Sequence, residues 1–265
     1  MRVGSIVSRA AVLGIAGVLL LAGTASAAEI KVMLSGGFST AYRELVPQFE
    51  RATGHKVTTS AGASMGGAPD SIPVRLQRGE PADVLIMAAS ALDGLIKEGK
   101  AVAGSRVDLA RARIGMVVRA GAPKPDIGSV DALKRTLLAA KSIAFSASAS
   151  GVYLSGEVFP RLGIADQIKD KSKRIESERV AAVVARGEAE IGFQQISELL
   201  PVPGVELVGP LPPEVQRVTV FAAGVAVGAK EPDAAGALIK FLASPAAAAA
   251  ITKSALEPMD DAPKK

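Results

Sequence analysis

The sequence contains no cysteine and no tryptophan, and His55 is its only histidine. Without cysteine the chain can form neither disulfides nor thiolate metal sites, and it has no thiol nucleophile. One histidine cannot supply a two-histidine metal site, and no carboxylates follow the spacing of a calcium-binding loop. These absences predict a protein without a bound metal.

Aromatic residues and strong charge bias are also scarce. There are two tyrosines and seven phenylalanines, and 31 basic residues against 26 acidic ones give a net charge of +5. Arg2 and Arg9 in the N-terminal segment contribute two of these positive charges. A nucleic-acid-binding surface needs a basic stripe with stacking aromatics, so we expect no nucleic-acid partner. The weakly cationic remainder is instead suited to a small anion.

One continuous apolar run is present, from Ala10 to Gly23, and it follows Arg2 and Arg9. It is too short to cross a bilayer, and Ala25-Ser26-Ala27 has the A-x-A pattern of a cleavage site. We therefore predict a signal peptide over residues 1–27, cleaved after Ala27, a periplasmic mature chain and no membrane span. A retained N-terminal anchor is the alternative.

Beyond this segment, short apolar strands alternate with amphipathic helices. Expected strands cover 29–34, 56–60, 82–87, 114–119, 142–145, 189–193 and 218–227. Expected helices cover 40–53, 72–78, 90–98, 130–140, 151–162, 180–186, 232–242 and 245–255. Segments 121–125 and 201–210 have the composition of loops, and the tail from Glu257 is predicted to be disordered. This alternation predicts an α/β fold with mainly parallel sheets and helices on both faces.

Three turns of small polar residues each follow a strand and open a helix. They are Ser35–Gly37, Ala63–Gly67 and Ser146–Gly151. Helix N-termini present unpaired N–H groups and a positive dipole end, which favour anions. A single turn of this kind is an ordinary helix cap. Three of them at equivalent places predict an anion held in a cleft between two lobes.

Charged and polar side chains near these turns are further candidates. Arg75 and Arg78 share one face of a predicted helix, Arg119 ends a strand, and Tyr153 follows the third turn. Guanidinium groups suit planar carboxylates, although solvated surface charges are the simpler interpretation.

Of the other polar residues, three have positions typical of caps and turns, and two glutamines follow a strand. His55 follows a helix end, and Glu176 and Glu178 precede a predicted helix that either could cap. Gln194 and Gln195 follow a strand, where α/β sheets contact ligands.

Four runs resemble the periplasmic substrate-binding proteins of the molybdate-binding type. They are Phe49–Val57, Gly79–Val84, Gly187–Gly192 and Phe241–Pro245. The resemblance implies the two-lobed, type 2 periplasmic binding protein fold, with two crossings and a cleft that closes on its ligand. Placing the crossings near Arg113 and Val218 gives lobe 1 as 28–112 with 220–265, and lobe 2 as 113–219.

Three departures from that family concern the ligand. Gly37 stands where molybdate binders carry a serine, and Gln195 stands where they carry a tyrosine ligand. The second turn is followed by about five extra residues, from Gly66 to Asp70, an insertion that loops tolerate. These departures predict an anion larger than molybdate.

A second set of runs resembles the aconitate isomerases, periplasmic enzymes built on the same fold. It comprises Ser64-Met65-Gly66 with Ile72–Leu76, Ser105–Leu109, Val118–Ile127, Ser148–Tyr153 and Gly192–Gln195. The resemblance implies interconversion of trans- and cis-aconitate by an allylic proton shift, with no metal or other cofactor. Ala147 departs from it, because an acidic residue is expected there.

The candidate proton-transfer residues are Ser148, Tyr153 and Glu176. Expected binding residues are Ser35, Gly36, Gly37, Ser64, Met65, Arg75, Arg119, Ser146, Ser150, Gly151, Gln194 and Gln195. The alternative function is a non-catalytic binding protein of an ABC importer, which would deliver a carboxylate or an oxyanion such as molybdate to a permease.

Overall fold

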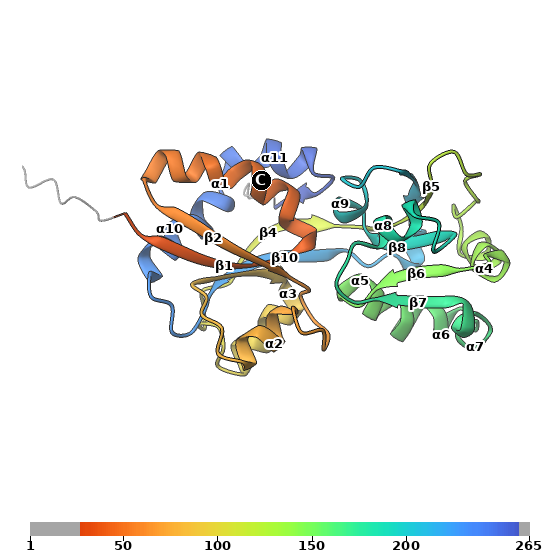
Figure 1. Ribbon diagram of the computed structural model, residues 1–265, viewed down its shortest axis with the longest axis horizontal. Coiled ribbons are helices and arrows are strands. Elements are labelled where there is room, and N and C mark those ends of the chain that lie inside the picture. Colours follow the sequence, from red (N-terminus) through yellow and green to blue (C-terminus); the bar gives the residue numbers. More distant parts are fainter. Residues whose placement is uncertain (1–26, 260–265) are drawn as a thin grey trace, which may run out of the picture.

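The computed structural model describes residues 27–259. The predicted signal peptide, apart from Ala27, lies outside the described residues, as do residues 260–265. Two α/β lobes lie side by side along the long axis of the molecule (Figure 1). Each lobe is built on its own sheet, so the predicted two-lobed α/β fold is confirmed.

The first sheet has six strands in the order β11-β4-β10-β3-β1-β2. Its strands are β1 Glu29–Ser35, β2 Lys56–Gly62, β3 Val84–Ala88, β4 Val107–Ala112, β10 Thr219–Val225 and β11 Glu257–Pro258. Every residue of β3 is buried, which agrees with its uninterrupted apolar sequence.

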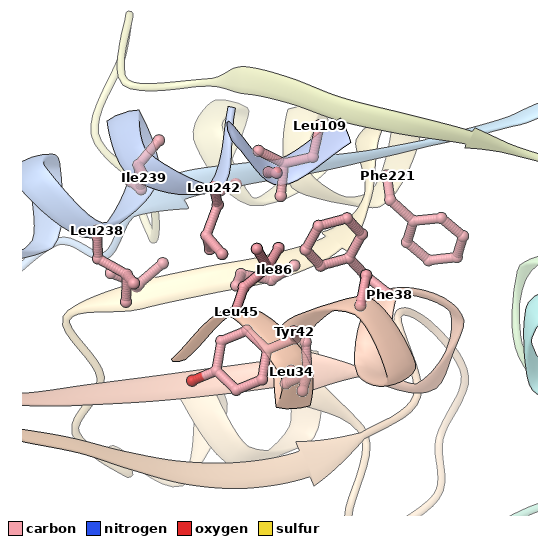
Figure 2. Close-up of a cluster of buried hydrophobic side chains, with 14 of the residues drawn as sticks. Leu34, Phe38, Tyr42, Leu45, Ile86, Leu109, Phe221, Leu238, Ile239 and Leu242 are labelled. Atoms are coloured by element: carbon pink, nitrogen blue, oxygen red, sulfur yellow. The ribbon is translucent and has the colours of Figure 1, made fainter. Parts of the chain in front are cut away.

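Apolar clusters cover both faces of the first sheet. One face packs against the late helices and the first helix, through residues such as Phe38, Leu45, Phe221 and Leu242 (Figure 2). The other face packs through Met33, Leu85 and Leu92. Burial on both sides makes this sheet a rigid support for the turns at its edge.

The second sheet has five strands in the order β7-β6-β8-β5-β9. Its strands are β5 Ile114–Arg119, β6 Ile143–Ser146, β7 Ser172–Ile175, β8 Ile191–Gln195 and β9 Val205–Pro210. It too has an apolar cluster on each face, one with Phe145, Phe159 and Phe193 and the other with Val180 and Val184.

The predicted helices are all present, with ends that agree to within a few residues, and several short helical segments occur that were not predicted. Those of the first sheet are η1 Gly36–Phe38, α1 Ser39–Thr53, α2 Ile72–Gln77, α3 Ala89–Lys97, α10 Pro232–Leu242, η5 Pro245–Ala247 and α11 Ala248–Lys253. Those of the second sheet are α4 Val130–Ala139, α5 Ala149–Tyr153, η2 Leu154–Val158, α6 Phe159–Arg161, α7 Ala165–Ile168, η3 Lys169–Lys171, α8 Val180–Ala185, α9 Ile196–Leu199 and η4 Pro213–Val215. The predicted helix at 151–162 contains a π-helical turn, η2. Gly54 ends α1 in the left-handed conformation, at φ +75°, which a glycine adopts without strain.

Three expectations about the sheets are corrected. The sheets are mixed, because β10 is antiparallel to β3 and β4, and β5 is antiparallel to β8 and β9. Part of the segment expected to be a loop, 201–210, forms β9, which pairs with β5. The tail expected to be disordered begins with β11, which pairs with β4.

Two segments join the sheets. Arg113 separates β4 from β5, and residues 211–218 lead from β9 to β10. The Gln216 side chain ties these segments together, since its Oε1 accepts from the Ile114 N–H at 3.0 Å and its Nε2 donates to the Ile114 carbonyl at 2.8 Å.

Between residues 27 and 259, no single helix is long and apolar enough to cross a membrane. The pair Pro232–Leu242 and Pro245–Lys253, bent by 58°, passes that test by length and composition only.

Candidate active site between the two lobes

A pocket of about 500 Å³ lies between the two lobes. The first lobe contributes the end of β1, the start of α1 and the end of β2. The second lobe contributes the turn after β6, the segment before α8, and polar side chains of β8 and α9. Its polar and charged lining residues are Ser35, Ser39, Tyr42, Arg43, Thr59, Asp70, Ser146, Ser148, Glu176, Ser177, Glu178, Arg179, Gln194 and Glu198.

The first turn places a directed hydroxyl on the wall of this pocket. Ser64 Oγ accepts from the Ala88 N–H at 2.9 Å and donates to Ser35 Oγ at 2.8 Å. Because Ser64 donates its single hydroxyl hydrogen to Ser35, the Ser35 hydroxyl can donate its own hydrogen to a ligand. Ser35 therefore faces the pocket as expected, and the buried Ser64 lies behind it as its support.

The third turn reaches the pocket from the second lobe. Ser146 and Ser148 line it, and Ser148 Oγ accepts from the Ser64 N–H at 3.2 Å across the lobe boundary. Ser150 is buried behind Ser146, with their hydroxyl oxygens 3.0 Å apart. A Cβ at Gly151 would overlap the Ser146 carbonyl, so this turn is compatible only with glycine there.

Two arginines from different lobes converge on one hydroxyl. Ser39 Oγ accepts from Arg43 Nη2 at 3.3 Å and from Arg179 Nη2 at 3.1 Å. Arg43 is on α1 of the first lobe, whereas Arg179 precedes α8 in the second. Burial lowers the pKa of Arg179, the Glu198 charge opposes this effect, and the nearby Arg43 charge adds to it. Two like charges directed at one oxygen atom create a place that an anion would stabilise.

Glu198, on α9, supplies a carboxylate to the same pocket. Its Oε1 accepts from Gln194 Nε2 at 2.9 Å. Desolvation raises the pKa of Glu198 to about 7, against opposing effects from the Arg179 charge and the Gln194 hydrogen bond. A carboxylate with this pKa exchanges protons near neutral pH, as a general acid or base must.

The remaining acidic residues at the pocket have basic or hydroxyl partners. Glu176 Oε1 lies 3.2 Å from Arg174 Nε, and Glu178 Oε2 lies 3.0 Å from Arg186 Nη1. Asp70 Oδ1 accepts from Ser177 Oγ at 3.1 Å, which is another contact between the lobes. These partners offset the negative charge at the mouth of the pocket.

Several residues expected in the cleft are elsewhere. Arg75 forms an ion pair with Glu80 at 2.6 Å and donates to the Asp70 carbonyl at 3.1 Å, outside the pocket lining. Arg119 is exposed at the end of β5, also outside the lining. This corrects their expected position, because a nearby carboxylate competes for Arg75 and β5 runs away from the cleft.

Tyr153 and Met65 face a second hollow of about 460 Å³. The Tyr153 hydroxyl donates to the Val215 carbonyl at 3.1 Å, and the Arg217 guanidinium lies 3.9 Å from its ring centroid. Tyr153 is thus fixed against the second crossing segment, away from the pocket of Ser35 and Glu198.

Gly37 and Gln195 are buried outside the pocket lining, whereas Gly36 and Gln194 line it. A Cβ at Gly37 would overlap the Phe221 ring, which explains why no serine can stand there. Gln195 Nε2 donates to Thr219 Oγ1 at 2.8 Å, at the start of β10. Both residues therefore pack where the two lobes meet.

The sequence did not indicate Arg43, Arg179 or Glu198 as site residues. Arg43 follows Ser39 by four residues on α1, so a helical face was the available signal. Glu198 follows Gln194 by the same spacing, just beyond the expected strand. No group of three His, Asp or Glu side chains able to hold a metal ion occurs among residues 27–259.

Comparison with known proteins shows which family this chain resembles. The profile of the bacterial extracellular solute-binding protein family matches residues 30–256. An aconitate isomerase of Pseudomonas sp is 48% identical over 252 residues, which cover 93% of this chain and 96% of that protein. The molybdate-binding protein of Azotobacter vinelandii is 33% identical over 184 residues, or 68% of this chain and 69% of its own length.

Solved structures show the same fold. The periplasmic molybdate-binding protein of Azotobacter vinelandii superposes with a TM-score of 0.69 at 24% identity, covering 87% of this chain and 100% of its own. The sulfate-binding protein of Mycobacterium tuberculosis superposes with a TM-score of 0.69 at 20% identity, covering 88% of each chain. Both resemblances found in the sequence are confirmed, and the chain belongs to the bacterial extracellular solute-binding protein family.

Proposed function

We propose that this protein is an aconitate isomerase, which interconverts trans- and cis-aconitate by an allylic proton shift in the pocket between its lobes. The observation that carries the proposal is the convergence of Arg43 and Arg179 on Ser39, in the pocket that also holds Glu198. The 48% identity to an aconitate isomerase, over nearly the full length of both chains, supports the same reaction.

The two arginines suit a carboxylate of the substrate. Each guanidinium presents several N–H donors in a plane, and a carboxylate oxygen between them relieves the repulsion of two like charges. Arg179 is half-buried, so its attraction to an anion is screened less than that of a surface arginine. In this proposal Arg43 and Arg179 hold one carboxylate, with the Ser39 hydroxyl beside it.

The serines suit a charge that develops during the reaction. Removal of a proton beside a carboxylate gives a dienolate, whose negative charge needs donors already in place. The Ser35 hydroxyl, oriented by Ser64, and the turn at Ser146 and Ser148 provide such donors on the pocket wall. The pocket volume of about 500 Å³ falls in the range that encloses small organic ligands.

We further propose the lobe boundaries and location expected from the sequence. Lobe 1 comprises 28–112 with 220–265 and lobe 2 comprises 113–219, because the chain passes between the sheets near Arg113 and Val218. The signal peptide is removed after Ala27, and the mature protein works in the periplasm, as expected for an extracellular solute-binding family.

The test uses the protein expressed from its full sequence and purified from the periplasm of a bacterial host. It is incubated with trans-aconitate, and cis-aconitate is measured by chromatography. We expect turnover by the wild type. Arg179→Met should raise KM by about 10- to 100-fold, since a hydrogen bond to a charged group contributes about 1.5–3 kcal/mol. Arg135→Met, on the outer surface of α4, is the matched control and should leave KM unchanged.

The alternative remains a binding protein of an ABC importer, and the same preparation distinguishes it. Absence of turnover, combined with thermal stabilisation by a tricarboxylate, would replace the isomerase with a transport receptor. Stabilisation by molybdate alone would favour the oxyanion ligand of the relative from Azotobacter vinelandii.

A further inference from the structure

Glu198 occupies an unusual position for a carboxylate. It lies on the short helix α9, which follows β8 of the second lobe and contacts η1 and α1 of the first lobe. In Figure 1, α9 is at the edge of the second lobe that faces the first. The carboxylate is therefore brought to the pocket at the place where the lobes meet.

The neighbours of Glu198 fix which of its oxygens can exchange a proton. Gln194 Oε1 accepts from the Val180 N–H at 2.9 Å, so the amide nitrogen of Gln194 must face Glu198. That nitrogen donates to Glu198 Oε1 at 2.9 Å. Because Oε1 accepts this hydrogen bond in either charge state, a proton bound by Glu198 resides on Oε2.

The first lobe leaves room for this carboxylate by means of a glycine. A Cβ at Gly36 would overlap Glu198 Oε1, so any other residue at position 36 would displace the carboxylate. The adjacent residue, Ser197, donates to the Gly37 carbonyl at 2.8 Å in a buried contact. The Gly36-Gly37 turn thus accommodates α9 in two ways. The Gly37 carbonyl accepts a hydrogen bond from it, and Gly36 has no side chain that would overlap it.

We propose that Glu198 is the catalytic residue that carries the proton between the two ends of the allyl system, through its Oε2 atom. The proposal rests on the proposed function. Oε2 takes a proton from the methylene carbon beside a carboxylate, and the C–H electron pair enters the dienolate. The same proton then returns to the far end of the allyl system, the double bond shifts by one position, and Glu198 is regenerated as a carboxylate. No oxidant, reductant or co-reactant is consumed.

The three candidates expected from the sequence are less suited to this role. Glu176 is exposed and paired with Arg174, and the Tyr153 hydroxyl donates to a backbone carbonyl at the second hollow. Ser148 has the ordinary weak basicity of a hydroxyl and no neighbouring base in hydrogen-bond contact among the described residues. Its contact with the Ser64 N–H fits a role in holding the lobes together.

Desolvation, opposed by the Arg179 charge and the Gln194 hydrogen bond, determines the pH at which Glu198 can act as a base. Of the charged residues that line the pocket with it, Arg43 and Arg179 are basic, and Asp70, Glu176 and Glu178 are acidic. The carboxylate form is needed to remove the first proton, so activity rises with pH through the pKa of Glu198, which is about 7.

The experiment compares wild type, Glu198→Gln and Glu44→Gln in conversion of trans-aconitate to cis-aconitate. Gln has the shape of Glu and can still accept from Gln194, and Glu44 is an exposed carboxylate on α1 that serves as the control. We expect Glu198→Gln to lower kcat by at least about 100-fold, with KM changed by less than about 3-fold. Glu44→Gln should behave as the wild type.

Two further measurements distinguish loss of the proton carrier from loss of structure. Calorimetric titration of Glu198→Gln with trans-aconitate should give a Kd equal to or lower than that of the wild type, because a negative charge is removed from an anion site. In the wild type kcat/KM should rise through a pKa near 7, and the residual activity of the variant should lack this step.

Each result has a definite meaning. Turnover by Glu198→Gln within about 5-fold of an active wild type would overturn the role of Glu198 and leave the isomerase intact. Loss of both turnover and trans-aconitate binding in the variant would also overturn it, because Glu198 would then support the structure of the site. An inactive wild type would instead refute the proposed function, whatever the variant does.

Discussion

Replacing Glu198 by glutamine should stabilise the protein relative to the wild type by an amount that increases as the pH rises. The pKa of Glu198 is raised from its ordinary value of 4.5 to about 7, chiefly by desolvation. Between these two values the folded protein binds more protons than the unfolded chain, so the stability of the wild type falls as pH rises. The effect is complete above the folded pKa and absent below the unfolded one.

The difference between 4.5 and about 7 corresponds to about 3 kcal/mol in the free energy of unfolding. Glu198→Gln has no charge to bury, so its stability relative to the wild type should increase by about 3 kcal/mol from pH 4 to pH 8. At pH 5 less than about 1 kcal/mol of this gain should be present. Any constant cost of the amide itself adds equally at every pH and does not alter the trend.

Urea unfolding of both proteins at pH 4, 5, 6, 7 and 8 measures this trend, with Glu44→Gln as the control. The control should keep a nearly constant difference from the wild type, because its carboxylate is exposed. A stability difference between Glu198→Gln and the wild type that does not vary with pH would refute the reasoning, since it would mean that Glu198 is as well solvated in the folded state as in the unfolded chain.

Three further predictions concern the same junction of the lobes. Gly36→Ala should lower kcat by at least about 10-fold in the isomerase assay while circular dichroism stays native, because the new Cβ displaces the Glu198 carboxylate; an unchanged kcat would show that the carboxylate need not occupy its observed place. Arg179→Met should move the rising limb of the kcat/KM profile to higher pH, since the Arg179 charge lowers the pKa of Glu198; a shift to lower pH would contradict this. Ser197→Ala leaves the Gly37 carbonyl without its donor at a cost of about 1–3 kcal/mol, and small-angle X-ray scattering of the unliganded variant should show a larger radius of gyration; an unchanged radius would mean that this bond does not hold the lobes closed.

The fold was predictable where local pattern and burial agree. The sequence of β3, five apolar residues in succession, indicates a buried strand, and it lies at the centre of the first sheet. In contrast, β4 has aspartate and arginine among its six residues, and β9 ends in glycine and proline. Both are strands because their neighbours β10 and β5 pair with them, and such long-range pairing overrides local composition.

The backbone turns of the site could be predicted from the sequence, whereas its charged residues could not. The turns containing Ser35 and Ser146 reach the pocket, because strand ends and helix starts fix their positions. Arg75 does not reach it, because Glu80, five residues further along the chain, binds its guanidinium. Glu198 could not be predicted, because its environment arises only when α9 enters the turn at Gly36 in the other lobe.

The position of β10 has a consequence for how the chain folds during its synthesis. This strand lies between β3 and β4 in the first sheet, although more than a hundred residues separate it from β4 along the chain. As the polypeptide emerges, the whole second lobe is complete before residues 219–225 arrive to fill the gap. Until then β3 is unpaired along one edge and β4 along both, because β10 and β11, the two strands that pair with β4, come later in the chain. Such unpaired edges can pair with other chains. Because synthesis runs from the N-terminus, the first lobe is the first to be started and the last to be completed. A chaperone that shields its unpaired strands would act on the segment 84–112.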